Sequence, residues 1–212
     1  ISMALTKIKV QQLTKLELYK YTHLIMPNSK YLDINIEQLD KIKAWVKQGG
    51  QLISFQQAAV WAEKNIQEME VEKLEKEETI KPKQYHQFDL DKAENTIGGA
   101  IVSTQADLSH PLSFGMSQKT QYALLKGDTQ LLKSKNAYST PLIMDSLAAG
   151  YISEARQQEL KQASLLIVDK LGQGSVIKFG FNPNFRGFWL GTQKWLINSL
   201  YFSSLVKKTE LN

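Results

Sequence analysis

The chain has 212 residues, of which 42% are hydrophobic and 22% charged, and this suits one globular domain with a sizeable core. Its formal net charge of +5 comes from scattered lysines without a basic stripe, which argues against a nucleic-acid-binding protein. The absence of cysteine excludes disulfides and thiolate chemistry, and no apolar run approaches the roughly 20 residues of a membrane span.

The first predicted elements form a strand–helix–strand unit. Thr22–Pro27 is an apolar run closed by proline, as in a buried strand that stops at a loop. Residues 36–46 have apolar side chains at helical spacing, after a capping box in which Asn35 precedes Gln38 by three positions. Gln51–Phe55 is a second strand. The short links indicate that the two strands are parallel.

A charged stretch follows the second strand. Residues 58–83 begin as a helix and then carry charges of both signs, which is more typical of a solvated helix and linker than of an interaction arm. We therefore treat residues 63–97 as a charged helix-and-linker insertion within a single domain that spans residues 1–212.

The rest of the chain mixes strands and helices. We expect strands within residues 98–116 and 122–126, a helix from about 153 to 162, a glycine-turned hairpin over 164–181 and a last helix over about 187–206. This order predicts an α/β fold, a three-layer sandwich with a mainly parallel sheet whose N-terminal βα unit is missing.

The histidines do not suggest a metal site. A zinc site needs three or four histidine, cysteine or carboxylate ligands. The chain has only His23, His86 and His110, and none belongs to an HExxH or HxxE motif. His86 and Asp89 would supply two ligands without a third. We therefore expect no metal or other cofactor in this chain, and His86 is interpreted as a surface residue.

Two turns where an α/β enzyme places its reactive groups carry amides instead. A nucleophile commonly sits on the sharp turn between a strand and a helix, and here Gln56 and Gln57 occupy that turn. Ser54 lies within the strand. At the end of a late strand, where a histidine would serve as general base, the chain has Asn182. An amide neither attacks nor takes a proton at neutral pH, so we predict no catalytic residue.

Two loops carry residues that allow both a functional and a structural interpretation. Arg186 has the donors to hold a carboxylate bidentately, or it ties neighbouring loops together. Asp107 and His110 are three residues apart and could form an acid–base pair. Ordinary turn chemistry explains them more simply, with Asp107 binding backbone amides and His110 fixing the loop.

Several stretches together resemble a known family. They are "YTHLIMPN", "IKAWVKQGGQLISF", "GAIVSTQADLSHPLSFG" and, most specifically, "NPNFRGFWLGTQKWLINSLYF". From about Tyr21 to Phe202, the chain resembles the glutamine-amidotransferase-like domain that follows the catalytic domain in certain bacterial zinc carboxypeptidases of the carboxypeptidase A type. The resemblance implies a class I glutamine-amidotransferase-like fold, related to flavodoxin.

The resemblance does not extend to the catalytic residues. The family's cysteine and His-Pro-Glu positions fall near Gln56 and at Asn182, so glutaminase activity is not implied. The carboxypeptidase zinc ligands match nothing here, so zinc is expected only in an upstream catalytic domain. The chain lacks an initiator methionine and is expected to be a fragment of that longer protein, which the resemblance places in the periplasm or outside the cell.

Three hypotheses follow. The first is a non-catalytic accessory domain, whose partner is its own upstream peptidase domain and which stabilises that domain or positions a peptide or cell-wall substrate. The second is a small-ligand-binding module, in which Gln56, His110, Asn182 and Arg186 converge at the carboxyl edge of the sheet. The third is a cryptic hydrolase that uses Asp107 and His110 with an unrecognised serine.

Overall fold

The computed structural model describes residues 4–67, 82–127, 129–130, 132, 134 and 136–209. The strands are β1 His23–Met26, β2 Gln51–Phe55, β3 Ala100–Ala106, β4 Thr120–Leu125, β5 Leu142–Gly150, β6 Ser164–Leu171 and β7 Gly174–Phe179. The α-helices are α1 Ile36–Lys47, α2 Gln57–Asn65, α3 Phe88–Asn95, α4 Glu154–Leu160 and α5 Leu190–Phe202. Short 3-10 helices are η1 Val10–Gln12, η2 Leu18–Lys20, η3 Tyr85–Gln87, η4 Pro111–Ser113, η5 Phe185–Gly187 and η6 Ser203–Leu205.

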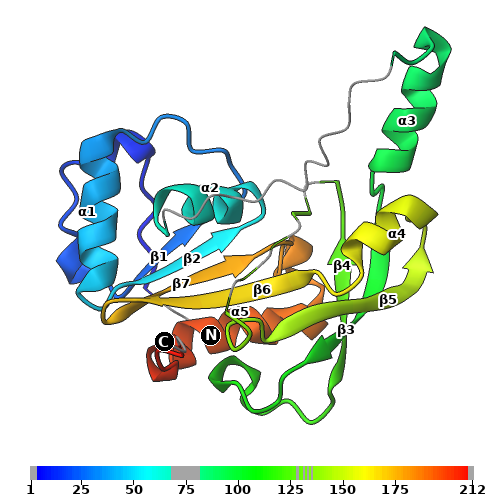
Figure 1. Cartoon of the computed structure of the whole chain (residues 1–212). Coiled ribbons are helices and arrows are strands. Elements are labelled where there is room, and N and C mark those ends of the chain that lie inside the picture. The colour runs from blue at the N-terminus through cyan, green and yellow to red at the C-terminus, as the bar shows by residue number, and fades with distance from the viewer. Residues whose placement is uncertain are drawn as a thin grey trace.

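The described strands form one sheet in the order β1-β2-β7-β6-β5-β3-β4 (Figure 1). Strands β1, β2 and β7 run parallel to one another. The remaining neighbours, β7 with β6, β6 with β5, β5 with β3 and β3 with β4, are antiparallel. The α/β class is therefore confirmed, but the expectation of a mainly parallel sheet is wrong.

The connections between strands explain why half of the sheet is antiparallel. A two-residue turn at Gly172-Gln173 joins β6 to β7, and such a short link reverses the chain. Gly174, just after this turn, passes so close to α1 that a Cβ atom there would lie 2.1 Å from the carbonyl oxygen of Val46. The β1–α1–β2 segment has the helical crossover that makes β1 and β2 parallel.

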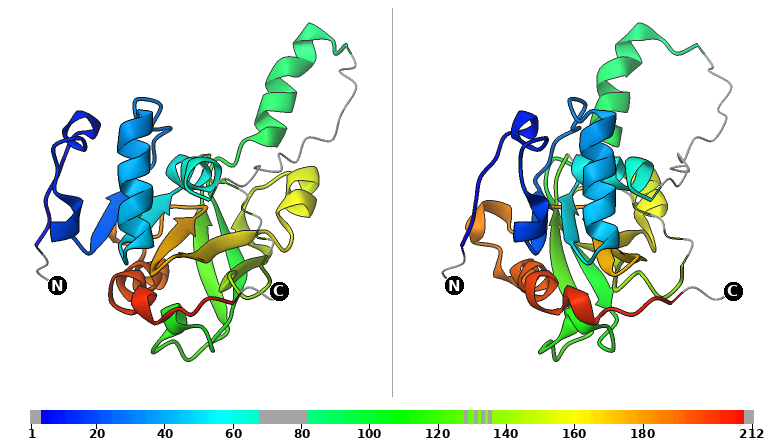
Figure 2. Two further views of the ribbon diagram at one scale, coloured as in Figure 1. Left: turned by 60° about the vertical axis from the view of Figure 1, so that its left-hand side comes forward. Right: turned by 90° about the vertical axis from the view of Figure 1, so that its left-hand side faces the viewer.

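The molecule has three layers (Figures 1 and 2). Helices α1 and α2 cover one face of the sheet and α5 covers the other, while α3 extends away from the body. Successive side chains of β2 point to opposite faces of the sheet and enter two hydrophobic clusters. Leu52 packs in the cluster on the α1 side, and Ile53 packs in the cluster on the α5 side. Trp195 of α5 is fully buried in the cluster on the α5 side. The expected three-layer arrangement is therefore present.

Local signals placed α1 correctly. Asn35 accepts a hydrogen bond at 2.9 Å from the backbone N–H of Gln38, and the Gln38 side chain accepts one in return at 3.1 Å from that of Asn35. Helix α2 begins the charged stretch as expected, but residues 68–81 lie outside the described part. Helix α3 and strand β5 were not predicted.

Candidate functional site

The parallel part of the sheet brings three chain segments to one edge. Because β1, β2 and β7 point the same way, their carboxyl ends meet there. Asn28 follows β1, Gln56 follows β2 and Asn182 follows β7. The structure thus places two of the predicted crevice residues, Gln56 and Asn182, at the expected edge.

Gln56 occupies a strained turn between β2 and α2. Its φ of 54° and ψ of −114° correspond to the first central position of a type II′ turn, which favours glycine. A non-glycine residue in such a region costs about 1–3 kcal/mol, and such residues cluster at functional sites. The backbone N–H of Gln56 donates to the carbonyl of Phe179 at 2.7 Å, which ties the turn to the end of β7.

The Gln56 side chain is 8% exposed and forms no hydrogen bond with another described residue. Its neighbour Gln57 is bound from β1: the side-chain oxygen of Asn28 accepts from the Gln57 backbone N–H at 3.1 Å, at the first turn of α2. The turn is therefore held from both adjacent strands, while the amide that it carries makes no hydrogen bond within the described part of the chain.

The loop after β7 is held by its own side chains. Asn182 accepts from the backbone N–H of Asn184 at 3.0 Å, and Thr192 donates to the carbonyl of Pro183 at 2.8 Å. Asn182 therefore has a structural role in this turn. Arg186 does not tie the loop together, because it is exposed and its guanidinium lies 5.3 Å from the ring centre of Phe185 without a hydrogen bond or ion pair to a described residue.

His110 does not join these residues. Strand β3 is antiparallel to β5, and the alternation continues to β7, so the loop after β3 leaves at the opposite edge of the sheet from Gln56. The prediction that all four crevice residues converge is therefore wrong for His110. The physical reason is the antiparallel half of the sheet, which reverses the direction of β3.

The surroundings of His110 are structural. Its Nδ1 accepts from the backbone N–H of Leu112 at 3.2 Å, where His110 is the N-cap of η4. Burial lowers the pKa of the His110 imidazole to about 4, against a smaller opposing attraction from Asp107. The ring is therefore neutral at pH 7, and its buried Nε2 has no hydrogen-bond partner.

Asp107 binds its own turn. Its carboxylate accepts from the backbone N–H of Ser109 at 2.9 Å and from the Ser109 hydroxyl at 2.6 Å. Burial acts to raise the pKa of Asp107, but the hydrogen bonds from Ser109 outweigh it and leave the pKa below its usual value. Ser54 donates to the carbonyl of Ile177 at 3.2 Å and is fully buried in the sheet. Asp107, His110 and Ser54 do not form a hydrogen-bonded series.

One charged cluster escaped the sequence analysis. Lys178 of β7 is 0% exposed and forms ion pairs with Glu63 of α2 and Asp169 of β6, the latter at 2.6 Å. It attaches α2 to the sheet. A single lysine within the apolar strand "GSVIKF" is the sequence signal that could have revealed it.

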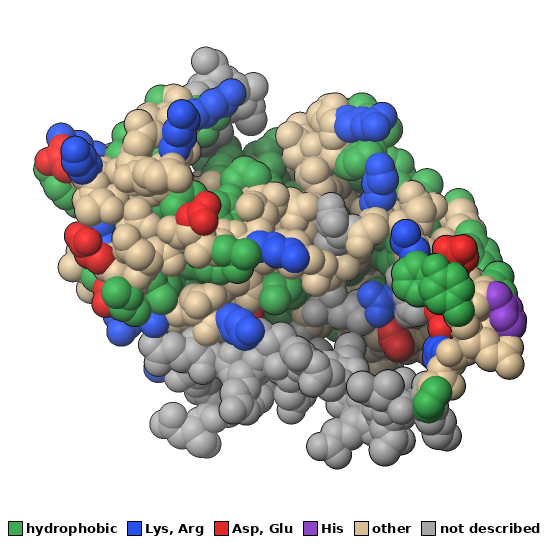
Figure 3. All heavy atoms as spheres, turned by 90° about the horizontal axis from the view of Figure 1, so that it is seen from above, with side chains coloured by type: hydrophobic (Ala, Val, Ile, Leu, Met, Phe, Trp, Pro, Cys, Tyr) green, Lys and Arg blue, Asp and Glu red, His purple; other side chains and the backbone are tan. Residues whose placement is uncertain are grey.

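Among the residues described here, no three His, Asp or Glu side chains gather as a metal ion would require. No described helix has the length and apolar character to cross a bilayer. Seen from above, lysine, arginine and acidic side chains are scattered over the face that carries α1 and α2 (Figure 3).

The chain matches no protein-family model, and a search of curated proteins finds no significant match. Solved structures are similar at low identity. The cytoplasmic protein STM3548 from Salmonella typhimurium has 14% identity and a TM-score of 0.44, over 91% of this chain and 78% of that one. A ThuA-like protein from Bacteroides uniformis has 11% identity and a TM-score of 0.47, over 92% and 75%.

A third similar structure is a β-galactosidase from Bacillus circulans sp. alkalophilus. It has 14% identity and a TM-score of 0.45, over 94% of this chain and 25% of that one. At these identities and scores, the three likenesses carry no inference about function.

Proposed function

We propose that this chain is a non-catalytic, class I glutamine-amidotransferase-like accessory domain of a secreted or periplasmic zinc carboxypeptidase. It stabilises the peptidase domain or positions its peptide or cell-wall substrate. The observation that carries the non-catalytic part is the turn at Gln56, which has the strained backbone of a reactive-residue turn and an inert amide on it.

The surrounding residues support the same conclusion. A nucleophile on the β2–α2 turn would need a base within hydrogen-bond reach. The adjacent loop supplies Asn182, whose side chain already accepts a backbone hydrogen bond. His110 is at the other edge of the sheet. The strain at Gln56 therefore persists without a reaction that uses it.

The purified chain tests the non-catalytic part directly. Glutaminase, esterase and carboxypeptidase assays, with and without added zinc, should show no turnover above the rate without protein. Robust turnover that disappears in His110→Ala would contradict the proposal. The sequence encoded before Ile1 tests the parent enzyme: a His-x-x-Glu motif and a signal peptide there support it, and their absence counts against it.

A second candidate function is a small-ligand-binding module at the same edge. The observation in its favour is that the Gln56 amide and the Arg186 guanidinium have no hydrogen bonds to other described residues. An acidic ligand would bind Arg186 bidentately and accept from the Gln56 amide. His110 has no part in this module.

The binding test uses the only two arginines of the chain. Titration calorimetry with a diglutamate peptide as the probe should show binding that Arg186→Ala abolishes with little change in melting temperature. Arg156→Ala is the matched control, because Arg156 pairs with Glu159 on α4. Equal loss of binding in both variants, or no binding by the unmodified chain, would argue against this candidate for acidic peptides.

A further inference from the structure

Helix α5 carries apolar side chains on its outward face as well as against the core, where Thr192, Asn198 and Ser199 are also buried. Its inward face puts Trp195, Leu196 and Leu200 into or against the core. Its outward face repeats the pattern, with Leu190, Ile197 and Tyr201 at helical spacing. A surface helix normally has a polar outer face, and a helix that is apolar all round is normally buried. The outer side of α5 therefore has the character of a covered surface.

Charge is nearly absent from this helix. Lys194 is its only charged residue, and its ammonium group donates to the backbone carbonyl of Gly115. The lysine is thus bound to the neighbouring loop and does not make the outer face strongly charged. No acidic side chain lies in α5, so a second apolar surface can approach without burying an unpaired carboxylate.

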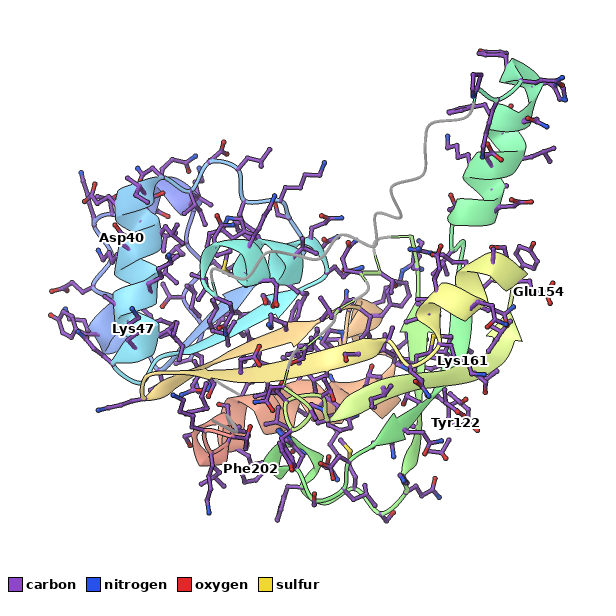
Figure 4. All side chains as sticks on the ribbon, in the orientation of Figure 1. Asp40, Lys47, Tyr122, Glu154, Lys161 and Phe202 are labelled. Atoms are coloured by element: carbon purple, nitrogen blue, oxygen red, sulfur yellow. The ribbon has the colours of Figure 1, made fainter. Side chains whose placement is uncertain are left out.

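Residues next to the helix enlarge the apolar surface. Phe114 packs on Phe202 at a centroid distance of 4.7 Å, and Tyr201 lies beside the same ring at 6.4 Å. Figure 4 shows Phe202 on the side of the sheet away from α1 and α2. We define the α5 patch as Phe114, Phe188, Leu190, Ile197, Tyr201 and Leu205. All but the half-buried Ile197 are 51–69% exposed.

The size of the α5 patch is suited to an interface. A large side chain exposed to this degree offers roughly 100 Å² of apolar surface, so the patch amounts to roughly 500–600 Å². That is at the upper end of the largest patch on a typical monomer. Two such patches face to face would bury roughly 1,000–1,200 Å², which reaches the lower limit for a specific protein–protein interface.

We propose that the α5 patch binds the α5 patch of a second copy of this chain, as a two-fold symmetric dimer. An isologous contact needs a self-complementary surface, and an antiparallel pair of α5 helices centred at Ile197 provides one. In that arrangement Leu190 faces Leu205 of the other copy, and the Lys194 ammonium faces its Tyr201 ring. The pairing covers the exposed apolar stripe and places the one cation against an aromatic face.

Sedimentation equilibrium of the purified chain tests the association. The mass should rise from 24.1 kDa toward twice that value between about 1 and 200 μM protein, as for a weak interface of this size. A mass that stays at 24.1 kDa throughout this range would overturn the proposal. So would association that continues beyond the dimer, because an isologous contact is closed.

Variants then locate the interface. Leu190→Asp with Tyr201→Glu should abolish the dimer, and since both side chains are exposed the monomer should keep its circular dichroism spectrum. Leu32→Asp, at an apolar residue near α1 that is 84% exposed, is the control and should still dimerise. Dimerisation that survives the α5 substitutions, or that Leu32→Asp removes as effectively, would place the contact elsewhere and overturn the proposal.

The cysteine-free sequence allows a direct geometric test. Ile197→Cys introduces the only thiol of the chain, close to the proposed two-fold axis. Mild oxidation should give a covalent dimer much faster than Leu32→Cys does at the same concentration. Equal rates for the two variants would contradict the predicted axis, even if the chain dimerises by another surface.

Discussion

Replacing Lys178 by methionine would leave Glu63 of α2 and Asp169 of β6 without the cation that they share. The lysine is fully buried, and the side chains of the two carboxylates are only 11% and 17% exposed. Removing one partner from a buried ion pair typically costs about 3–5 kcal/mol, because the remaining charge stays buried without compensation. For a chain of this length, that corresponds to a decrease in melting temperature of roughly 6–20 °C.

Urea unfolding followed by circular dichroism measures the effect. The triple variant Lys178→Met, Glu63→Gln, Asp169→Asn carries no charge at this place and should regain most of the lost stability. Glu159→Gln, which breaks the exposed pair with Arg156, should change the free energy of unfolding by less than about 1 kcal/mol. If Lys178→Met costs no more than Glu159→Gln does, the cluster does not attach α2 and the reasoning is refuted.

Three further predictions concern single residues. Gln56→Gly should stabilise the chain by about 1 kcal/mol in urea unfolding, because relief of the strained φ exceeds the entropy that glycine adds to the unfolded state. The control is Gln162→Gly, at an exposed residue that also has a positive φ. A loss of stability in Gln56→Gly alone would assign the Gln56 amide a structural role. Asn35→Ala should cost about 1 kcal/mol through loss of the α1 cap, and an unchanged melting curve would contradict this. The pKa of His110 is about 4 in the folded chain and 6.5 ordinarily, so the unfolded chain binds more protons between these pH values and the free energy of unfolding falls as the pH falls. From pH 7 to pH 5, the unmodified chain should lose about 2 kcal/mol more stability than the His110→Asn variant, whose side chain keeps the cap on Leu112.

Local signals in the sequence predicted much of the fold. The capping residues of α1, the proline after β1 and the short apolar run of β2 are each signals carried by a few neighbouring residues, so they could be recognised directly. The glycine turn between β6 and β7 and the helix expected from about residue 153 were also correct. Each of these depends on neighbouring residues alone.

The order of strands in the sheet depends on distant contacts and could not be predicted in this way. Strand β5 is mostly exposed over its second half, and its sequence "MDSLAAG" has no clear strand pattern. Without β5, the direction of β3 could not be assigned. The expectation that His110 joins Gln56 followed from that missing strand.

The candidate site was predicted in part for the same reason. Gln56 and Asn182 were identified by the turn that each occupies at the end of a strand, and the parallel pairing of β2 with β7 brings the two turns to one edge of the sheet. The cluster at Lys178 required knowledge that α2 lies over β6 and β7. Its three residues come from sequence positions 63, 169 and 178, and only the folded sheet brings them together.

The central claim is that this chain keeps the sharp strand-to-helix turn of an enzyme and has no reactive side chain to use there. Intact-mass spectrometry after incubation with a serine-reactive phosphonate probe tests it most directly. We predict that the mass stays at that of the unmodified chain. A stoichiometric adduct on one serine that depends on His110 would contradict the account.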